Sequence, residues 1–408
     1  MSTSSARSRC QIDLFSPTSV ADPYPIYRYL RETTPVCWIA QGFWITTRYA
    51  DAVMLLNDSR CDHWGHDTNT FAAKSSAEAA LSRCLRLLSP VQPTPFRRAA
   101  FQAIITQMTE TAADENARHA DAILAAIAGR DRFDVIADYA HPFTMGAVCR
   151  LMGLSEAEST MLDAIIKVLP GGVLRGLSLP ANDGADYQDP ATTLRRFLSN
   201  VIADRRCHPL GDLPSQLIAD ESLSEETPDG DRQLINLLIL LFHAGHQNMM
   251  NFIGNALLAL VSHQDSLVAA RLSPALLAAG IEELLRYDSP VQYIPLVARE
   301  AITLADQLIE PGEQVWVGIG AANRDPEAFD SPDTLDLRRH AQRQLAFGHG
   351  AWRCIGARLA QIQGAIALQR FIAHVADFRV ADVPLRWRNA PVVQRGLFAL
   401  PLEGVRYE

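Results

Sequence analysis

The segment that most constrains the fold of this chain lies near its C-terminal end. It reads Phe347-Gly348-His349-Gly350-Ala351-Trp352-Arg353-Cys354-Ile355-Gly356. Cys354 stands where a glycine-rich loop enters a helix that we expect to begin near Ile355, and a positive helix terminus lowers the pKa of a thiol. Gly348 and Gly350 permit a tight bend that a Cβ would obstruct. The segment therefore predicts that the Cys354 thiolate is presented as a ligand, rather than packed as an inert buried cysteine.

Helical periodicity dominates the rest of the chain. Apolar residues recur at three- and four-residue steps over residues 96–127, 133–152, 191–204, 231–262, 274–287 and 355–376. Alternating, strand-like segments are fewer, at residues 36–39, 43–46, 315–319 and 396–407. With 408 residues, 48% hydrophobic content and no repeats, the chain is expected to form one mainly α-helical domain over residues 1–408.

Two further motifs precede the cysteine segment. Glu283 and Arg286 form an E-x-x-R pair, one helical turn apart, and residues 323–326 read N-R-D-P. Together with the pattern F-G-x-G-x-x-x-C-x-G, they give nearly the whole chain a resemblance to the cytochrome P450 superfamily. The resemblance implies a triangular, mainly α-helical prism with a small β region. It also implies haem b (iron protoporphyrin IX), buried between the helix at residues 231–262 and the cysteine loop.

The resemblance assigns roles to the residues of these motifs. Cys354 is the axial ligand of the haem iron, and Glu283 and Arg286 are a buried ion pair beneath the haem. Phe347 screens the sulfur from water. The glycines Gly348, Gly350 and Gly356 let the backbone approach the flat cofactor.

The helix above the haem departs from the pattern of the family. Family members usually carry A-G-x-E/D-T there, and the acid and the alcohol organise proton delivery. This chain reads Ala244-Gly245-His246-Gln247-Asn248. Ala244 lies against the haem and Gly245 leaves room for dioxygen, but the amides of Gln247 and Asn248 do not titrate near neutral pH. They can donate hydrogen bonds and hold water, so proton delivery is expected to be non-standard.

Several explanations of this departure are open. The substrate can supply a hydroxyl, amine or carboxyl group to the proton relay. The reaction can be a coupling, a desaturation, a nitrogen oxidation or a rearrangement rather than a hydroxylation. The iron can use peroxide instead of dioxygen and electrons, or water alone can relay the protons. The first two explanations together are favoured.

The residues expected around the haem carboxylates are also unusual. Family members hold these carboxylates with Arg and His side chains, whose charge-assisted hydrogen bonds suit them. Arg97 is kept, whereas residues of other types stand at four usual Arg or His positions: Pro93, Leu296, Thr334 and Trp352. We expect Arg97 to bind a carboxylate and Trp352 to stack on the haem or donate its indole N–H. Candidates to compensate for the missing partners are Arg98, Arg299, His349 and Arg353.

The resemblance also locates a substrate pocket and a docking surface. Mostly apolar side chains line the pocket above the haem, namely Val291, Ile294, Pro295, Leu296, Val393 and Leu397, and residues 61–76 and 169–190 close it.

Six arginines and no acidic residue occur over residues 337–376 of a chain with net charge −9. They predict a positive surface that steers an acidic ferredoxin or flavodoxin, itself reduced by a reductase. The alternative is a solvated helix face with core arginines.

Composition narrows the setting of the protein. The acidic balance argues against a nucleic-acid partner. Seven irregularly spaced cysteines argue for a reducing compartment, and hence for the cytoplasm. The N-terminus has no apolar signal region, and the apolar runs are broken before membrane-spanning length, so no membrane association is expected. The family resemblance makes a monomer the default.

These features predict a P450 monooxygenase or oxidase of EC 1.14 type. It is expected to act on a small functionalised organic substrate in natural-product biosynthesis, either free or tethered to a carrier protein. A different class, a non-catalytic haem sensor or recruitment domain, would be favoured by loss of Cys354 or of the Glu283–Arg286 pair. Both are present, so an enzyme is expected.

Overall fold

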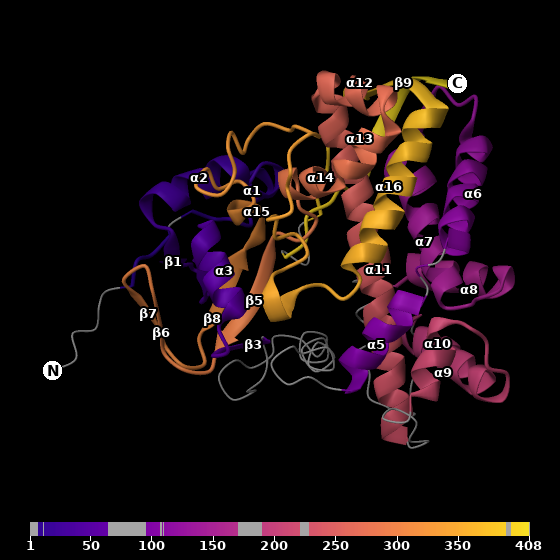
Figure 1. Ribbon diagram of the computed structural model, residues 1–408, viewed down its shortest axis with the longest axis horizontal. Coiled ribbons are helices and arrows are strands. Elements are labelled where there is room, and N and C mark those ends of the chain that lie inside the picture. Colours follow the sequence, from indigo (N-terminus) through magenta and orange to yellow (C-terminus); the bar gives the residue numbers. More distant parts are fainter. Residues whose placement is uncertain are drawn as a thin grey trace. The chain divides into compact units, whose positions relative to one another are not determined.

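The computed structural model describes residues 7–10, 12–63, 95–106, 108, 110–169, 190–220, 228–388 and 393–407. The chain forms two compact units, in which helices predominate and sheets are small, as the sequence predicts (Figure 1). The first unit comprises Met1–Trp64, Ala117–His141 and Asn248–Glu408, and the second comprises Gly65–Asn116 and Pro142–Gln247.

The helices of the first unit are mostly short. They are α1 (Pro17–Ala21), α2 (Tyr24–Thr33), α3 (Tyr49–Asn57), the π-helix η1 (Val135–Ala140), α12 (Gln264–Leu272), α13 (Pro274–Ala279), α14 (Ile281–Tyr287), α15 (Ile319–Ala322), the 3-10 helix η3 (Gly350–Trp352) and α16 (Ala357–His374). The long helix α16 packs beside α13 and α14 (Figure 1). Ser273 caps α13, and a proline at its first position has no N–H that would need a partner.

The described residues of the first unit form three sheets. Their strands are β1 (Val36–Trp38), β2 (Trp44–Thr46), β3 (Cys61–His63), β4 (Arg132–Asp134), β5 (Tyr293–Ala298), β6 (Ile302–Leu304), β7 (Gln307–Ile309), β8 (Gln314–Gly318), β9 (Val375–Val380) and β10 (Pro401–Tyr407). The largest sheet has the order β1-β2-β8-β5-β3, with β2 and β8 parallel and the other pairs antiparallel. Its fully buried residues Trp44, Val315 and Leu296 anchor a hydrophobic core. The other sheets are β4-β10-β9 and the pair β6-β7.

The second unit is helical in its described part. It holds α5 (Pro95–Thr106), α8 (Glu156–Lys167), α9 (Pro190–Cys207) and α10 (Leu213–Ala219), while α6 (Glu110–Ile127), α7 (His141–Leu151) and α11 (Pro228–Ser262) contribute residues to both units. A buried ion pair between Arg205 and Asp212 joins α9 to the start of α10, with Nε and Oδ2 2.5 Å apart. Arg205 also donates to the carbonyl of Gly153.

The helix boundaries differ from the sequence prediction in informative ways. The run 96–127 forms two helices, α5 and α6, and the run 274–287 is divided at Gly280. The run 133–152 opens with β4 and η1 before α7 begins. Strand β5 was not predicted, because Pro295 in its middle is atypical of a strand interior. None of the described helices is both long and apolar enough to cross a membrane.

Candidate functional site

The loop that carries Cys354 is closed by its own backbone. The Cys354 N–H donates to the Phe347 carbonyl at 2.7 Å, and η3 lies between these two residues. Helix α16 begins at Ala357 with Gly356 as its N-cap, so the predicted start near Ile355 was two residues too early. The Cys354 side chain is exposed, although cysteine is among the residue types most often buried. The fold therefore presents this sulfur, as the sequence predicts.

The glycines of the loop are required by its backbone angles and by close contacts with other residues of the chain. Gly348 has φ +72°, and a Cβ there would lie 2.4 Å from the Trp352 carbonyl oxygen. Gly350 has φ +54°, and a Cβ there would lie 2.3 Å from the Asn57 side chain of α3. The predicted tight bend is confirmed, and its cause includes packing of the loop against its own backbone and α3. At Gly356 a Cβ would meet only the Cys354 sulfur, at 4.0 Å, among the residues that the structure describes, so these residues leave the space beside Gly356 open.

These observations fit a haem iron bound through a single thiolate. An exposed sulfur with open space beside it can ligate a metal in a flat group without moving the loop. Among the residues that the structure describes, no three His, Cys, Asp or Glu side chains are grouped as they would be around a metal ion. A lone soft donor suits haem-thiolate ligation better than a closed zinc site, which needs four ligands.

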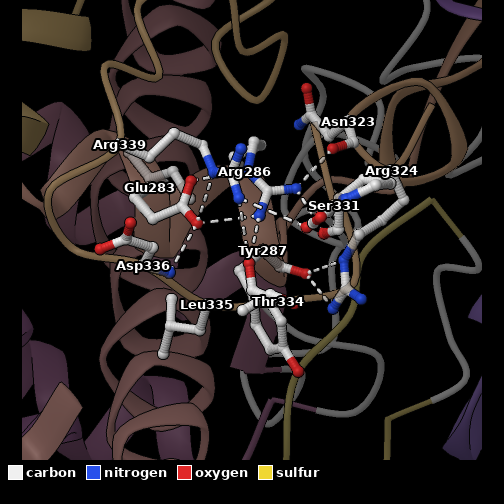
Figure 2. Close-up of polar contacts among 12 residues, drawn as sticks. Glu283, Arg286, Tyr287, Asn323, Arg324, Ser331, Thr334, Leu335, Asp336 and Arg339 are labelled. Atoms are coloured by element: carbon white, nitrogen blue, oxygen red, sulfur yellow. Dashed lines mark hydrogen bonds and ion pairs between the residues drawn. The ribbon is translucent and has the colours of Figure 1, made fainter. Parts of the chain in front are cut away.

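Glu283 and Arg286 form a fully buried ion pair on α14 (Figure 2). Two parallel hydrogen bonds join them, from Arg286 Nε to Glu283 Oε2 at 2.6 Å and from Nη2 to Oε1 at 2.9 Å. Arg286 also donates to the backbone carbonyls of Asn323, Pro332 and Thr334, at 2.9, 2.7 and 3.2 Å. The guanidinium therefore satisfies the buried carboxylate and fixes the chain that leads to the cysteine loop.

Glu283 binds a second arginine that the sequence analysis had placed on a docking surface. Arg339 Nε donates to Glu283 Oε1 at 3.1 Å, and the backbone N–H of Asp336 donates to the same oxygen at 3.0 Å (Figure 2). The Arg339 side chain is only 17% exposed. Assigning Arg339 to the positive surface was therefore wrong, because this guanidinium neutralises a buried carboxylate.

The N-R-D-P turn links the same region to the N-terminal helices. Asn323 Oδ1 accepts from the backbone N–H of Leu345 at 2.7 Å, which connects the turn to the segment before the cysteine loop. Arg324 donates to the Tyr287 carbonyl, and its guanidinium lies 4.0 Å from the ring centroid of Tyr24. The turn thus holds α2, α14 and the approach to Cys354 together.

The predicted distal residues lie along α11. Ala244, Gly245 and Gln247 belong to the second unit and Asn248 to the first. Ala244 is exposed, and a Cβ at Gly245 would lie 3.1 Å from a methyl group of Val148. Close packing against α7 is thus one reason for the glycine; its predicted role in leaving room for dioxygen stays a prediction.

Two histidines on α11, His243 and His246, are packed within the protein. The His246 ring is buried and stacks on Phe242, with the centroids 5.5 Å apart. Burial lowers the pKa of His243 to about 4, because the desolvated ring resists protonation. His243 is therefore neutral near pH 7.

The candidate partners of the haem carboxylates come from several elements. Arg97, on α5, is half-buried, as are His349 and Trp352; Trp352 packs against the hydrophobic core of the large sheet. Arg353 and Arg98 are exposed. Arg299 already has a partner, since its Nη1 lies 3.7 Å from the buried carboxylate of Asp62. Pro93 lies outside the described residues.

The predicted pocket residues fall into two groups. Val291 forms an antiparallel bridge with Gln394, next to Val393, so the structure brings these parts of the predicted lining together. Ile294 and Pro295 on β5 are half-buried. Leu296 and Leu397 are fully buried among protein atoms. The predicted entrance at residues 169–190 falls almost wholly outside the described residues, as does most of 61–76.

Two site residues were missed in the sequence. Arg339 and Gln394 hydrogen-bond residues far away in the chain, so local spacing gave no signal for either. A signal did exist for Asn251 and Asn255, because their spacing from the predicted residue Asn248 places three amides on one face of a helix.

Comparisons with known proteins find cytochromes P450 among the proteins similar to this chain. The family Cytochrome P450 matches residues 274–386. Cytochrome P450 107B1 of Saccharopolyspora erythraea is 33% identical over 88% of each chain. Polyketide biosynthesis cytochrome P450 PksS of Bacillus subtilis is 28% identical, also over 88% of each chain. A solved structure of P450BioI in complex with a fatty-acid-ligated acyl carrier protein is 25% identical, with a TM-score of 0.79, over 96% of this chain and 100% of that one.

The similarity to these relatives covers 88% or more of this chain, well beyond the family match at residues 274–386. The structural likeness also confirms the predicted fold class. The chain belongs to the cytochrome P450 family, whose members bind haem b through a cysteine thiolate.

Proposed function

We propose that this P450 is a monooxygenase acting on a small functionalised organic substrate in natural-product biosynthesis. The observation that carries the proposal is the exposed Cys354 sulfur, held in a loop that the buried Glu283–Arg286 network fixes. The relative named for polyketide biosynthesis supports the pathway class. In the proposal, residues 1–408 act as one catalytic domain.

The residues of the cysteine loop would hold the cofactor. Cys354 would supply the thiolate ligand, and the half-buried Phe347 would shield the sulfur from water once the cofactor is bound. Arg97, His349 and Trp352 would bind the carboxylates, Ala244 would lie against the haem, and Gly348, Gly350 and Gly356 keep the backbone close. Bound haem supplies the activation of dioxygen for substrate oxidation, and the thiolate favours that chemistry.

Proton delivery is the non-standard part of the proposal. Gly245 would leave room for dioxygen. The amides of Gln247 and Asn248 donate hydrogen bonds and order water but do not exchange protons as an acid would. A hydroxyl, amine or carboxyl group of the substrate would then complete the relay. The same lack of an acid also suits coupling, desaturation, nitrogen oxidation or a peroxide-driven reaction. Val291, Ile294, Pro295, Leu296, Val393 and Leu397 would line the pocket.

Electrons would arrive from a ferredoxin or flavodoxin with its reductase. Four arginines of the segment 337–376 are exposed: Arg338, Arg343, Arg353 and Arg358. Such a positive surface on an acidic chain steers an acidic donor. A carrier-tethered substrate is a further possibility, since a neighbouring fold was solved with an acyl carrier protein. A cytoplasmic monomer completes the proposal.

Absorption spectroscopy tests the ligand assignment. We expect the purified ferric protein to show a thiolate-type Soret band, and Cys354→Ser to lose it because a serine oxygen does not replace a thiolate. Cys149→Ser, which changes a buried cysteine of α7, is the matched control and should keep the band. A thiolate-type band that survives in Cys354→Ser would contradict the assignment.

Measurements of substrate binding and electron consumption on the same purified protein distinguish an enzyme from a haem sensor. A panel of candidate metabolites should include one that shifts the ferric haem from low to high spin. With a surrogate ferredoxin and reductase, that compound should increase electron consumption and yield an oxidised product. Binding without any substrate-dependent electron consumption would instead favour a haem sensor or a recruitment domain.

A further inference from the structure

A stripe of asparagines runs along one face of α11. Asn248, Asn251 and Asn255 follow at steps of three and four residues, so they share that face. Asn251 and Asn255 are almost completely buried. Buried amides of this kind are normally hydrogen-bonded. Here the stripe meets the C-terminal turn at residues 394–396.

Each asparagine of the stripe meets a different residue of that turn. Gln394 Nε2 donates to Asn248 Oδ1 at 2.7 Å. Asn255 Nδ2 donates to the Arg395 carbonyl at 3.2 Å. A Cβ at Gly396 would lie 2.1 Å from Asn251 Oδ1, so only a glycine lets the turn approach the helix this closely.

The opposite side of the turn is held equally firmly. The backbone of Gln394 bridges to Val291, and the Arg395 N–H donates to the Pro290 carbonyl at 2.8 Å. The Arg395 guanidinium binds Asp288, with Nε and Oδ1 2.7 Å apart. Gln394 therefore extends its side chain toward α11 from a fixed backbone. A side chain supported in this way can fix the orientation of its partner.

The hydrogen bond from Gln394 occupies the acceptor of the Asn248 amide and leaves the amide as a hydrogen-bond donor. A primary amide has an oxygen acceptor and two N–H donors. The oxygen is occupied by Gln394, whereas Asn248 Nδ2 makes no hydrogen bond to any residue within the described ranges, and the side chain is half-buried. The two N–H donors thus remain available.

We propose that Gln394 is a positioning residue that fixes Asn248 as a hydrogen-bond donor on the distal side of the haem. The inference rests on the proposed function, because it takes Asn248 to stand where family members carry an alcohol. An alcohol can accept and donate, so it can pass a proton along. A donor-only amide stabilises an acceptor but passes nothing on, which gives a physical reason for a substrate group to complete the relay.

Carbon monoxide is a suitable probe, because its stretching frequency on ferrous haem falls when a hydrogen-bond donor faces its oxygen. We expect Asn248→Leu and Gln394→Leu each to raise the frequency, and the double variant to raise it no further than Asn248→Leu alone. Gln361→Leu is the matched control, since Gln361 makes one comparable hydrogen bond, to Glu282 at 2.8 Å. It should leave the frequency unchanged.

Gln394→Glu provides a second, pH-dependent measurement. Above the pKa of the introduced carboxyl, the carboxylate accepts from Asn248 Nδ2, the amide turns over and the frequency rises. Below that pKa, the protonated carboxyl donates to Asn248 Oδ1 and restores the wild-type frequency. A merely structural role for Gln394 would give no such titration.

The outcomes separate the inference from the proposed function. A thiolate-type carbon monoxide complex whose frequency ignores Gln394→Leu and does not titrate in Gln394→Glu would overturn the positioning role alone. A complex without thiolate character in the wild-type protein would overturn the proposed function, and this inference with it.

Discussion

At the scale of single residues, two amide side chains that do not titrate lie at the proposed reaction site of this P450, where their role would be to form hydrogen bonds. By the sequence resemblance, Gln247 and Asn248 are predicted to stand where an acid and an alcohol are usual, and Asn248 accepts a hydrogen bond from Gln394. Neither amide titrates near neutral pH, so we expect no ionisation of these two residues to appear in the pH profile of turnover. A pH dependence would instead report the substrate or other residues.

The ionisation of His243 on α11 should be visible in the stability of the protein. Its folded-state pKa of about 4 lies below the ordinary value of about 6.5, so the unfolded chain protonates first as the pH falls. The free energy of unfolding should then decrease between about pH 6.5 and pH 4, with a slope of up to about 1.4 kcal/mol per pH unit. Urea unfolding over this range measures it.

His243→Phe isolates this contribution, because it removes the ionisation and keeps an aromatic ring. The variant should lose that part of the slope while other groups keep theirs. Identical slopes in the two proteins would show that His243 titrates normally when folded.

Sequence analysis found the residues whose roles depend on local spacing. Glu283 and Arg286 face each other because they lie one helical turn apart, and the bend before Cys354 needs its glycines for backbone reasons. Arg339 and Gln394 could not be found this way, since tertiary packing alone brings each to its partner. The roles assigned to the distal and carboxylate-binding residues remain predictions.

At the scale of elements, a close helix contact supports the cysteine loop. Helix α16, which follows Cys354, approaches α11 at Gly364, where a Cβ would lie 2.7 Å from the Phe252 ring. Both residues belong to the first unit. The glycine thus allows the two helices to pack at a distance that a larger residue would increase.

Gly364→Ala should therefore destabilise the protein. Alanine favours a helix interior by about 1 kcal/mol over glycine, whereas overpacking a core typically costs about 1–3 kcal/mol. We expect a net decrease in the free energy of unfolding, measured by chemical denaturation. Gly211→Ala is the control, because no atom of the described part of the chain lies within 4 Å of a Cβ there. A more stable Gly364→Ala protein would show that Phe252 moves aside without cost.

Helix periodicity predicted most long elements but not where they end. Gly280 divides one predicted helix, and β9 begins at Val375, inside another. An apolar residue at a helix end serves equally well in a strand, so periodicity alone cannot place the transition. Strand β5 escaped prediction for the opposite reason, since its proline contradicts the usual pattern of a strand interior.

At the scale of the whole molecule, an acidic chain carries a local group of exposed arginines. The net charge is −9, yet residues 337–376 contain no acidic residue. The structure removes Arg339 from this group, and it places Arg370 3.5 Å from Asp121. The predicted docking surface is therefore smaller than the sequence suggested and centres on Arg338, Arg343, Arg353 and Arg358.

Electron transfer from an acidic ferredoxin should depend on this surface. Arg353→Gln and Arg358→Gln should lower the rate of haem reduction severalfold at low ionic strength, and added salt should reduce the difference because it screens exposed charges. Arg379→Gln removes an exposed arginine that pairs with Glu403, and it should have little effect. Equal losses in all three variants would indicate a response to net charge rather than a docking surface.

The way in which Arg286 makes its contacts has a consequence for the history of the sequence. Besides Glu283, it binds the carbonyl oxygens of Asn323, Pro332 and Thr334, which every amino acid possesses. Drift of the side chains at positions 332 and 334 is therefore compatible with an intact connection, and the threonine at position 334 contributes through its backbone alone. The side chains of this segment can therefore change during evolution while Arg286 keeps the course of its backbone unchanged.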